Sequence, residues 1–92
     1  MPSNHSELPS GPVLPMDQMR GGETGEIAKV VGGRGMKRRL TELGFSPGVP
    51  VRLIKGSFRS GPIMVKVGEA KIAIGRGMAR RVFVRSRPID DG

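Results

Sequence analysis

Residues 36–48 read MKRRLTELGFSPG, and they specify both a helix and the point at which that helix ends. Met36, Leu40 and Leu43 are spaced i, i+4 and i+7, so they share one face of a helix, while the basic residues 37–39 fall on the other faces. This spacing predicts an amphipathic helix of about two to three turns that packs its apolar face on the rest of the chain.

The end of this helix is marked by a glycine followed by an aromatic residue. Gly44 comes directly after the last apolar residue of the pattern, at a place where a left-handed residue closes many helices. Phe45 would then be positioned to pack back on Leu40. Pro47 and Gly48 prevent the helix from continuing and turn the chain toward a strand.

On both sides of the helix, short segments alternate in polarity or are rich in β-branched residues, which is typical of strands. The predicted strands are an edge strand in Val13–Met19 that is interrupted by Pro15, then Gly25–Val31, Val49–Lys55, Pro62–Val67, Ala70–Ile74 and Val82–Val84. Gly68 and Glu69 predict a hairpin connection, and residues 75–80 predict a turn that closes into a single helical turn. Because strands this short bury one face most economically by curling, we expect a mainly β fold, a small SH3-like barrel of five to six antiparallel strands with one short α-helix.

We expect the barrel to span residues 13–85, between flexible tails at residues 1–12 and 86–92 that are too polar to repay the entropy of ordering. Phe58 and Arg59 would lie at the tip of a loop in residues 56–62, GSFRSGP. The predicted core consists of Ile27, Val30, Leu40, Leu43, Phe45, Val51, Leu53, Ile63, Val65, Val67, Ile72, Ile74, Ala79, Val82 and Val84.

The chain is strongly basic, with 16 Lys and Arg residues against 8 Asp and Glu residues and a net charge of +8. Three acidic residues lie near the ends, so residues 13–87 hold 16 basic and 5 acidic side chains, a net charge of +11. This charge favours an acidic partner, which could be nucleic acid, anionic lipid headgroups or an acidic protein face. A run of about 18 apolar residues and a signal-peptide pattern are both missing, so we expect a cytoplasmic protein.

The side chains needed for catalysis or for soft metal ligation are scarce. The sequence has no cysteine or tyrosine, its single histidine is His5 in the N-terminal tail, and its acidic residues are dispersed. We therefore predict no catalytic, cofactor or metal residues and a function in binding. Gly32, Gly33 and Gly35 around Arg34 could form a phosphate loop, but they lack the spacing of a P-loop, and a flexible turn beside a solvated helix face is the favoured interpretation.

Three segments resemble the FeoA family of bacterial and archaeal ferrous iron uptake: RRLTELGFSPGVPVRLI from residue 38, GPIMVKV from residue 61 and AKIAIGRGMARRVFV from residue 70. The resemblance covers about Val13 to Val84. The positions that match its features are Leu40, Leu43, Gly44, Phe45, Pro47, Gly48, Gly61, Pro62, Ala73, Ala79, Val82 and Val84. The segment Ile74–Ala79 departs from the family's Leu-Arg-x-x-Glu-Ala pattern, so a contact made by that acidic residue is not expected here.

The resemblance implies an SH3-like barrel and a non-enzymatic accessory role beside FeoB, a membrane iron permease with a cytoplasmic GTP-binding domain. The family also carries an association with transition metal ions, for which this sequence offers no ligand set. The candidate surface for docking on the permease is the basic helix face, Lys37, Arg38 and Arg39, with Arg80 and Arg81 as a second patch. The alternative is that these side chains are simply solvated charges.

A second hypothesis is a small basic barrel that binds RNA or other nucleic acid through phosphate contacts. The charge supports it, but aromatic residues make up only 3% of the chain, and of the three phenylalanines Phe45 and Phe83 are expected to pack inside. Stacking platforms for bases are therefore scarce. An exposed Met64 or Phe58 could also support self-association.

Overall fold

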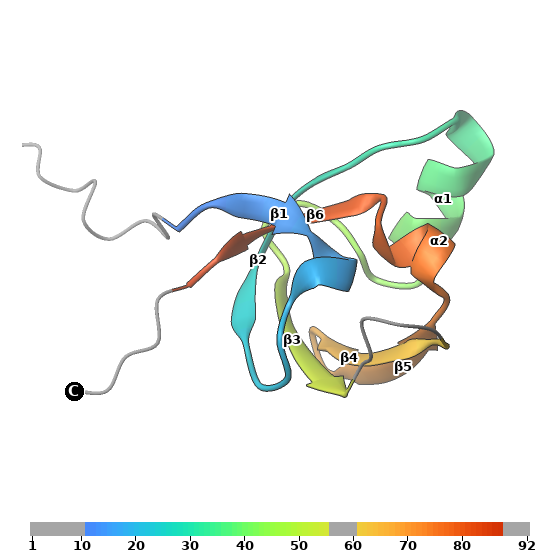
Figure 1. Ribbon diagram of the computed structural model, residues 1–92. Helices are drawn as coiled ribbons and strands as arrows, with labels where there is room; N and C mark the ends of the chain where they lie inside the picture. Colours follow the sequence, from blue (N-terminus) through green and yellow to red (C-terminus); the bar gives the residue numbers. More distant parts are fainter. Residues whose placement is uncertain (1–10, 56–60, 88–92) are drawn as a thin grey trace, which may run out of the picture.

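The structure, a computed structural model, describes residues 11–55 and 61–87 (Figure 1). This part of the chain forms six strands, two α-helices and one 3₁₀ turn. In chain order the elements are β1 (Val13–Pro15), η2 (Met16–Gln18), β2 (Thr24–Val30), α1 (Arg34–Glu42), β3 (Pro50–Lys55), β4 (Ile63–Val67), β5 (Ala70–Ile74), α2 (Arg76–Ala79) and β6 (Val82–Ser86). Each predicted strand is present, and the predicted single helical turn is α2.

All six strands belong to one antiparallel sheet with the order β1-β6-β2-β3-β4-β5. Strand β1 is an edge strand, as the proline in it predicts. The register shifts once in β2, between Ile27 and Lys29, and once in β3, between Leu53 and Lys55. Such irregularities bend strands, and the sheet curls so that β4 and β5 turn away from β1 and β6 (Figure 1).

Helix α1 ends as its sequence predicts. The amide of Phe45 donates to the carbonyl of Leu40 over 2.9 Å, and the amide of Gly44 donates to the carbonyl of Thr41 over 2.9 Å. Gly44 has a φ of +108°, so this is a Schellman motif with the glycine in the left-handed region. The helix begins at Arg34, two residues earlier than the apolar spacing indicates, after Gly33 as its extended N-cap.

Gly44→Ala should lower the free energy of unfolding by about 1 kcal/mol. The cost is conformational, because an added Cβ would only reach ordinary contact with Val67 at 3.6 Å. Gly35→Ala is the matched control: Gly35 lies inside α1, its φ is not positive and nothing lies near its Cβ position. That variant should be stabilised by about 0.5–1 kcal/mol. Urea unfolding of both variants checks this prediction, and equal midpoints would contradict the assigned cap.

The hydrophobic core lies inside the curled sheet. Leu40 of α1 and Phe45, which follows the end of the helix, close it, and both are fully buried. Twelve of the predicted core residues are buried, and Val30 and Ile72 are half-buried against them. The prediction for Leu43 is wrong, since 37% of this residue is exposed. Leu43 is the C-cap of α1, and the turn at Gly44 directs Phe45 rather than Leu43 into the core.

Two methionines that were not predicted complete the core. Met16 is fully buried and Met19 is 3% exposed. They belong to a segment read as an irregular edge strand, but η2 turns it so that both side chains face inward. The amide of Met19 donates to the carbonyl of Met16 over 3.2 Å, which is the i, i+3 spacing of a 3₁₀ turn.

Strand β6 runs to Ser86, two residues beyond the predicted end of the last strand and one residue beyond the predicted end of the barrel. Ser86 is 9% exposed, and its hydroxyl donates to Oε2 of Glu23 over 2.9 Å. Its amide donates to the carbonyl of Pro12 over 3.1 Å. These bonds hold both ends of the described chain together. Residues 1–10 and 88–92 of the predicted tails, and Phe58 and Arg59 of the predicted loop, lie outside the described residues.

Candidate functional site

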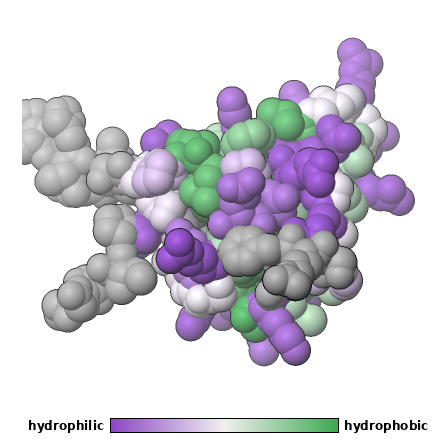
Figure 2. Space-filling model, in the orientation of Figure 1, coloured by the Kyte–Doolittle hydropathy of each residue, from purple (hydrophilic) through white to green (hydrophobic). Residues whose placement is uncertain are grey.

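Helix α1 presents the predicted basic face to solvent. Lys37, Arg38 and Arg39 are all exposed, whereas Leu40 beside them is fully buried. The first turn of α1 contains no acidic residue. The positive end of the helix dipole is therefore uncompensated within the helix, which raises the positive potential around its first turns. Hydrophilic side chains project from this region of the surface (Figure 2).

The second predicted patch adjoins the start of α1. Arg80 and Arg81 follow α2 and are both exposed. The carbonyl of Arg81 accepts a hydrogen bond from the amide of Val31 over 2.9 Å, just before α1 begins. An added Cβ on Gly32 would lie 3.6 Å from Cδ of Arg81, so the stem of Arg81 passes over this glycine. The fold thus joins the two basic segments, and we call Lys37, Arg38, Arg39, Arg80 and Arg81 the helix surface.

The helix surface carries no ion pair in residues 11–55 and 61–87. The one ion pair there joins Arg87 to Glu26, with 3.6 Å between Nη2 and Oε2. One further cation, the ammonium of Lys29, lies 5.2 Å from the ring centroid of Phe83. That half-buried ring is covered by a neighbour and is not a free stacking platform. The charges of the helix surface are therefore available to a partner.

Most residues that carry the family resemblance are structural. Leu40, Phe45 and Ala79 are fully buried, while the exposed Pro47 and Pro62 flank turns. The remaining matched glycines, Gly48 and Gly61, have φ values of +90° and +85°, as Gly44 also has a positive φ. These positions specify the turns and core that hold α1 in place, and Leu43 alone among the signature leucines reaches the surface.

A metal site does not fit the side chains in the described ranges. No group of three His, Cys, Asp or Glu residues there lies close enough to hold a metal ion. Over the same ranges, no helix combines the length and apolar character needed to cross a membrane.

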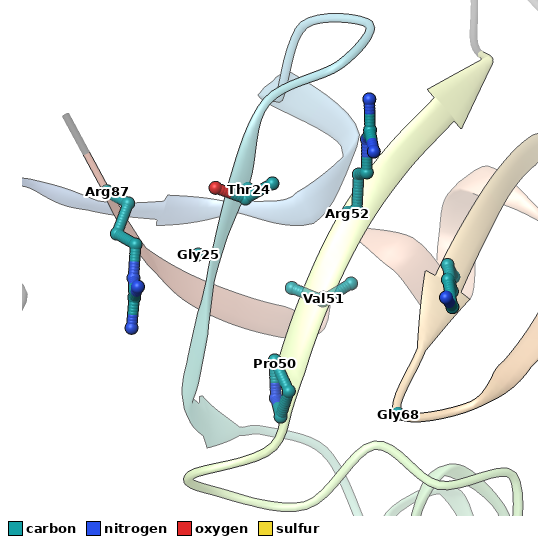
Figure 3. A pocket seen from close by; sticks show the side chains of 8 residues that line it. Thr24, Gly25, Pro50, Val51, Arg52, Gly68 and Arg87 are labelled. Carbon is teal, nitrogen blue, oxygen red and sulfur yellow. The ribbon is translucent and has the colours of Figure 1, made fainter. Parts of the chain in front are cut away.

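A second basic feature, which sequence reasoning missed, lies on the outer face of the sheet. A cleft of about 350 Å³ is lined by Thr24 and Gly25 of β2, Pro50, Val51 and Arg52 of β3, Lys66 of β4, Gly68 and Arg87 (Figure 3). Its three basic residues come from segments far apart in sequence, and only the pairing of the strands brings them to one cleft. Arg52 is directly paired with Lys66, whereas Arg87 lies on the other side of β2. Alternation along each strand predicts that they are exposed but not that they are neighbours.

The fold is a small curled barrel of antiparallel strands that carries exposed basic side chains. The FeoA domain family model matches residues 14–86. A protein described as Fe(2+) transport protein A from Methanocaldococcus jannaschii is 30% identical over 72 residues, which cover 78% of this chain and 85% of the relative. The chain therefore belongs to the FeoA family.

Solved structures agree with this assignment. The crystal structure of an iron uptake regulatory protein, FeoA, is 33% identical with a TM-score of 0.77, covering 82% of this chain and 99% of that one. The zinc complex of FeoA from Stenotrophomonas maltophilia, described as a prokaryotic SH3 domain protein, is 30% identical with a TM-score of 0.66, covering 75% of this chain and 86% of that one. The SH3-like class predicted from the sequence is confirmed.

Proposed function

We propose that this chain is a non-enzymatic accessory protein of ferrous iron uptake that docks on the cytoplasmic part of a FeoB-like permease. Membership of the FeoA family over residues 14–86 carries the proposal. The relative from Methanocaldococcus jannaschii is described as an Fe(2+) transport protein A, which connects this family to ferrous iron transport. The chain itself would act in the cytoplasm, where such a permease exposes its GTP-binding domain.

The helix surface is the proposed docking site. Its residues are exposed, none has an ion-pair partner in residues 11–55 or 61–87, and α1 holds three of them on a rigid element. An acidic face on the permease would meet this surface with complementary charge, which speeds encounter and sets orientation. Docking there would act on the GTPase cycle of the permease or on its assembly, because a bound partner shifts whichever state it binds more tightly.

An NMR titration tests the docking proposal. The isotope-labelled protein is titrated with the cytoplasmic GTP-binding domain of its cognate permease. We expect localised, saturable shifts in the amide signals of α1 and of residues 80–81, and unchanged signals in β3 and β4. Shifts spread evenly over the chain, or none that saturate, would contradict docking of this domain on the helix surface.

The charge of the chain supports a second candidate function, which is binding of nucleic acid through phosphates. Residues 13–87 have a net charge of +11. A titration with a generic RNA duplex at two salt concentrations separates the two functions. Neutralising about six phosphates would give a slope near −5 in a plot of log affinity against log salt concentration. Chemical shift changes with RNA that depend strongly on salt, together with no shift changes on addition of the permease domain, would favour this second function.

Self-association stays a prediction. Met64 is 38% exposed and Ile54 is 40% exposed, so both strands of the β3–β4 pair carry an exposed apolar side chain. Figure 2 shows hydrophobic side chains only in small patches on the face that it draws. Single exposed apolar residues are common on monomeric proteins, and they add no function of their own.

A further inference from the structure

Basic side chains form a line across the outer face of the sheet. Arg52 of β3 is the cross-strand partner of Lys66 of β4, and Lys66 is the partner of Lys71 of β5. On its other side, Arg52 is paired with Thr24 of β2. The carbonyl of Thr24 accepts a hydrogen bond from the amide of Arg87 over 3.0 Å, so Arg87 continues the line beyond β2. Directly paired residues point to the same face of a sheet. We call Arg87, Arg52, Lys66 and Lys71 the basic row.

Two clefts lie beside the basic row. The cleft shown in Figure 3 contains Arg87, Arg52 and Lys66. A second cleft, of about 320 Å³, contains Arg52, Lys66 and Lys71. The two clefts share Arg52 and Lys66 and lie on either side of this pair, the first toward Pro50 and Gly68 and the second toward Gly22 and Ile54. We call the two clefts together the groove. All four residues of the row are exposed.

The row is electrostatically unfavourable in the free protein. Like charges placed directly opposite each other on neighbouring strands destabilise a sheet. Arg87 has a partner in Glu26, at 3.6 Å, but Arg52, Lys66 and Lys71 form no ion pair in the described part of the chain. Three adjacent cations without a counter-charge are relieved by an anionic ligand, because its carboxylates would accept charge-assisted hydrogen bonds from them.

We propose that the basic row binds an acidic, extended segment of a partner protein. Neighbouring strands are about 4.8 Å apart, so the row spans about 19 Å from β6 to β5. An extended peptide rises about 3.4 Å per residue, and about six residues cover this distance with alternate side chains facing the sheet. Pro50 and Ile54 line the groove beside the cations, so an apolar residue between the acidic ones fits as well.

The lining of the groove favours a peptide over nucleic acid. The residues that line its two clefts include no aromatic side chain on which a base could stack. None of the five residues of the helix surface lines either cleft. The groove is therefore a second site, and the inference does not rest on the proposed function of the helix surface.

Fluorescence anisotropy tests the site with a labelled peptide of about eight residues in which glutamate alternates with alanine, a length that spans the row. The double variant R52Q/K66Q should weaken binding about tenfold, since two charge-assisted contacts are lost. The control R20Q/K29Q also removes one lysine and one arginine from exposed positions, which belong to neither the basic row nor the helix surface, and it should change the affinity less than about twofold. Equal losses in the two variants, or no loss in the first, would overturn the proposal.

Thermal stability provides a second, independent readout. Lys66→Gln removes the central charge of the row, so its melting temperature should rise by about 1–5 °C while the peptide affinity falls. Lys29→Gln, which replaces a single exposed lysine of β2 outside the basic row, should leave the peptide affinity unchanged. An unlabelled oligouridylate and vesicles containing an anionic lipid serve as competitors. The competitors are compared at equal concentrations of negative charges. If oligouridylate or the vesicles displace the labelled peptide more effectively than unlabelled peptide does, the acidic-peptide assignment is wrong.

Discussion

Leu40→Ala should lower the free energy of unfolding by about 2–5 kcal/mol, a large share of the stability of a domain this small. Leu40 is fully buried, and its carbonyl accepts the hydrogen bond from Phe45 that closes α1. Removal of the side chain leaves a cavity between the helix and the sheet, next to the equally buried Phe45. Because chains of this size bury a limited core, the variant should be substantially unfolded near 37 °C.

Leu43→Ala is the matched control for this prediction. The two leucines are three residues apart on the same helix and undergo the same chemical change, but Leu43 is 37% exposed where Leu40 is 0% exposed. We expect Leu43→Ala to cost about 1 kcal/mol or less. Urea unfolding monitored by circular dichroism gives both values. Equal losses for the two variants would mean that the apolar face of α1 packs differently from the arrangement described here.

The second large effect concerns partner binding. Replacement of Lys37, Arg38 and Arg39 together by Glu should weaken binding of the permease GTP-binding domain by about 100-fold or more, because reversed charges repel an acidic face as well as losing contacts with it. The variant should remain folded, since all three side chains are exposed and substitutions at exposed helix positions usually change stability little.

A charge-matched control makes this result specific. Replacement of Arg20, Lys55 and Arg85 by Glu changes the net charge by the same amount at exposed positions that belong to neither the helix surface nor the basic row. This control should retain the affinity for the permease domain within about threefold, a change expected from long-range charge alone. Isothermal titration calorimetry measures both variants, and circular dichroism verifies their folding. If both variants lose binding equally, the helix surface has no special role.

Much of the fold follows from local pattern. Alternation predicts the buried faces of β3 and β4, where Val51, Leu53 and Val65 are buried and Arg52 and Lys66 are exposed. The order Leu-Gly-Phe predicts the helix cap, because a left-handed glycine at C′ followed by an apolar residue at C″ is typical of the Schellman motif. These features depend on residues a few positions apart, so single-sequence reasoning reaches them.

The errors arise where tertiary packing selects among local options. Leu43 satisfies the helical spacing as well as Met36 does, yet the narrow contact between α1 and the sheet is filled by Leu40 and Phe45. Met16 and Met19 sit after Pro15 in a segment with no clear period, and their burial depends on contact between η2 and the distant elements β6 and α2. A short 3₁₀ turn lacks the repeating apolar spacing of a helix or a strand, so its buried residues cannot be predicted from such spacing.

The two basic surfaces also differ in whether local sequence pattern can predict them. The residues of α1 are predicted as one face because they are contiguous in sequence. The basic row brings together Arg52, Lys66, Lys71 and Arg87 through the pairing of β3, β4, β5, β2 and β6, which depends on strand register. Composition indicates that the chain is basic, but the positions at which its charges face one another are a property of the folded sheet.

Saturation binding to a full-length FeoB-like permease in lipid nanodiscs tests the docking proposal most directly, because this preparation presents every cytoplasmic surface of the partner. Empty nanodiscs of the same lipid composition serve as the blank. We expect saturable binding of the wild-type protein at one fixed stoichiometry, and loss of that binding when Lys37, Arg38 and Arg39 are replaced by Glu. Signal no greater than that of the empty nanodiscs, or binding that this replacement leaves intact, would contradict docking through the helix surface.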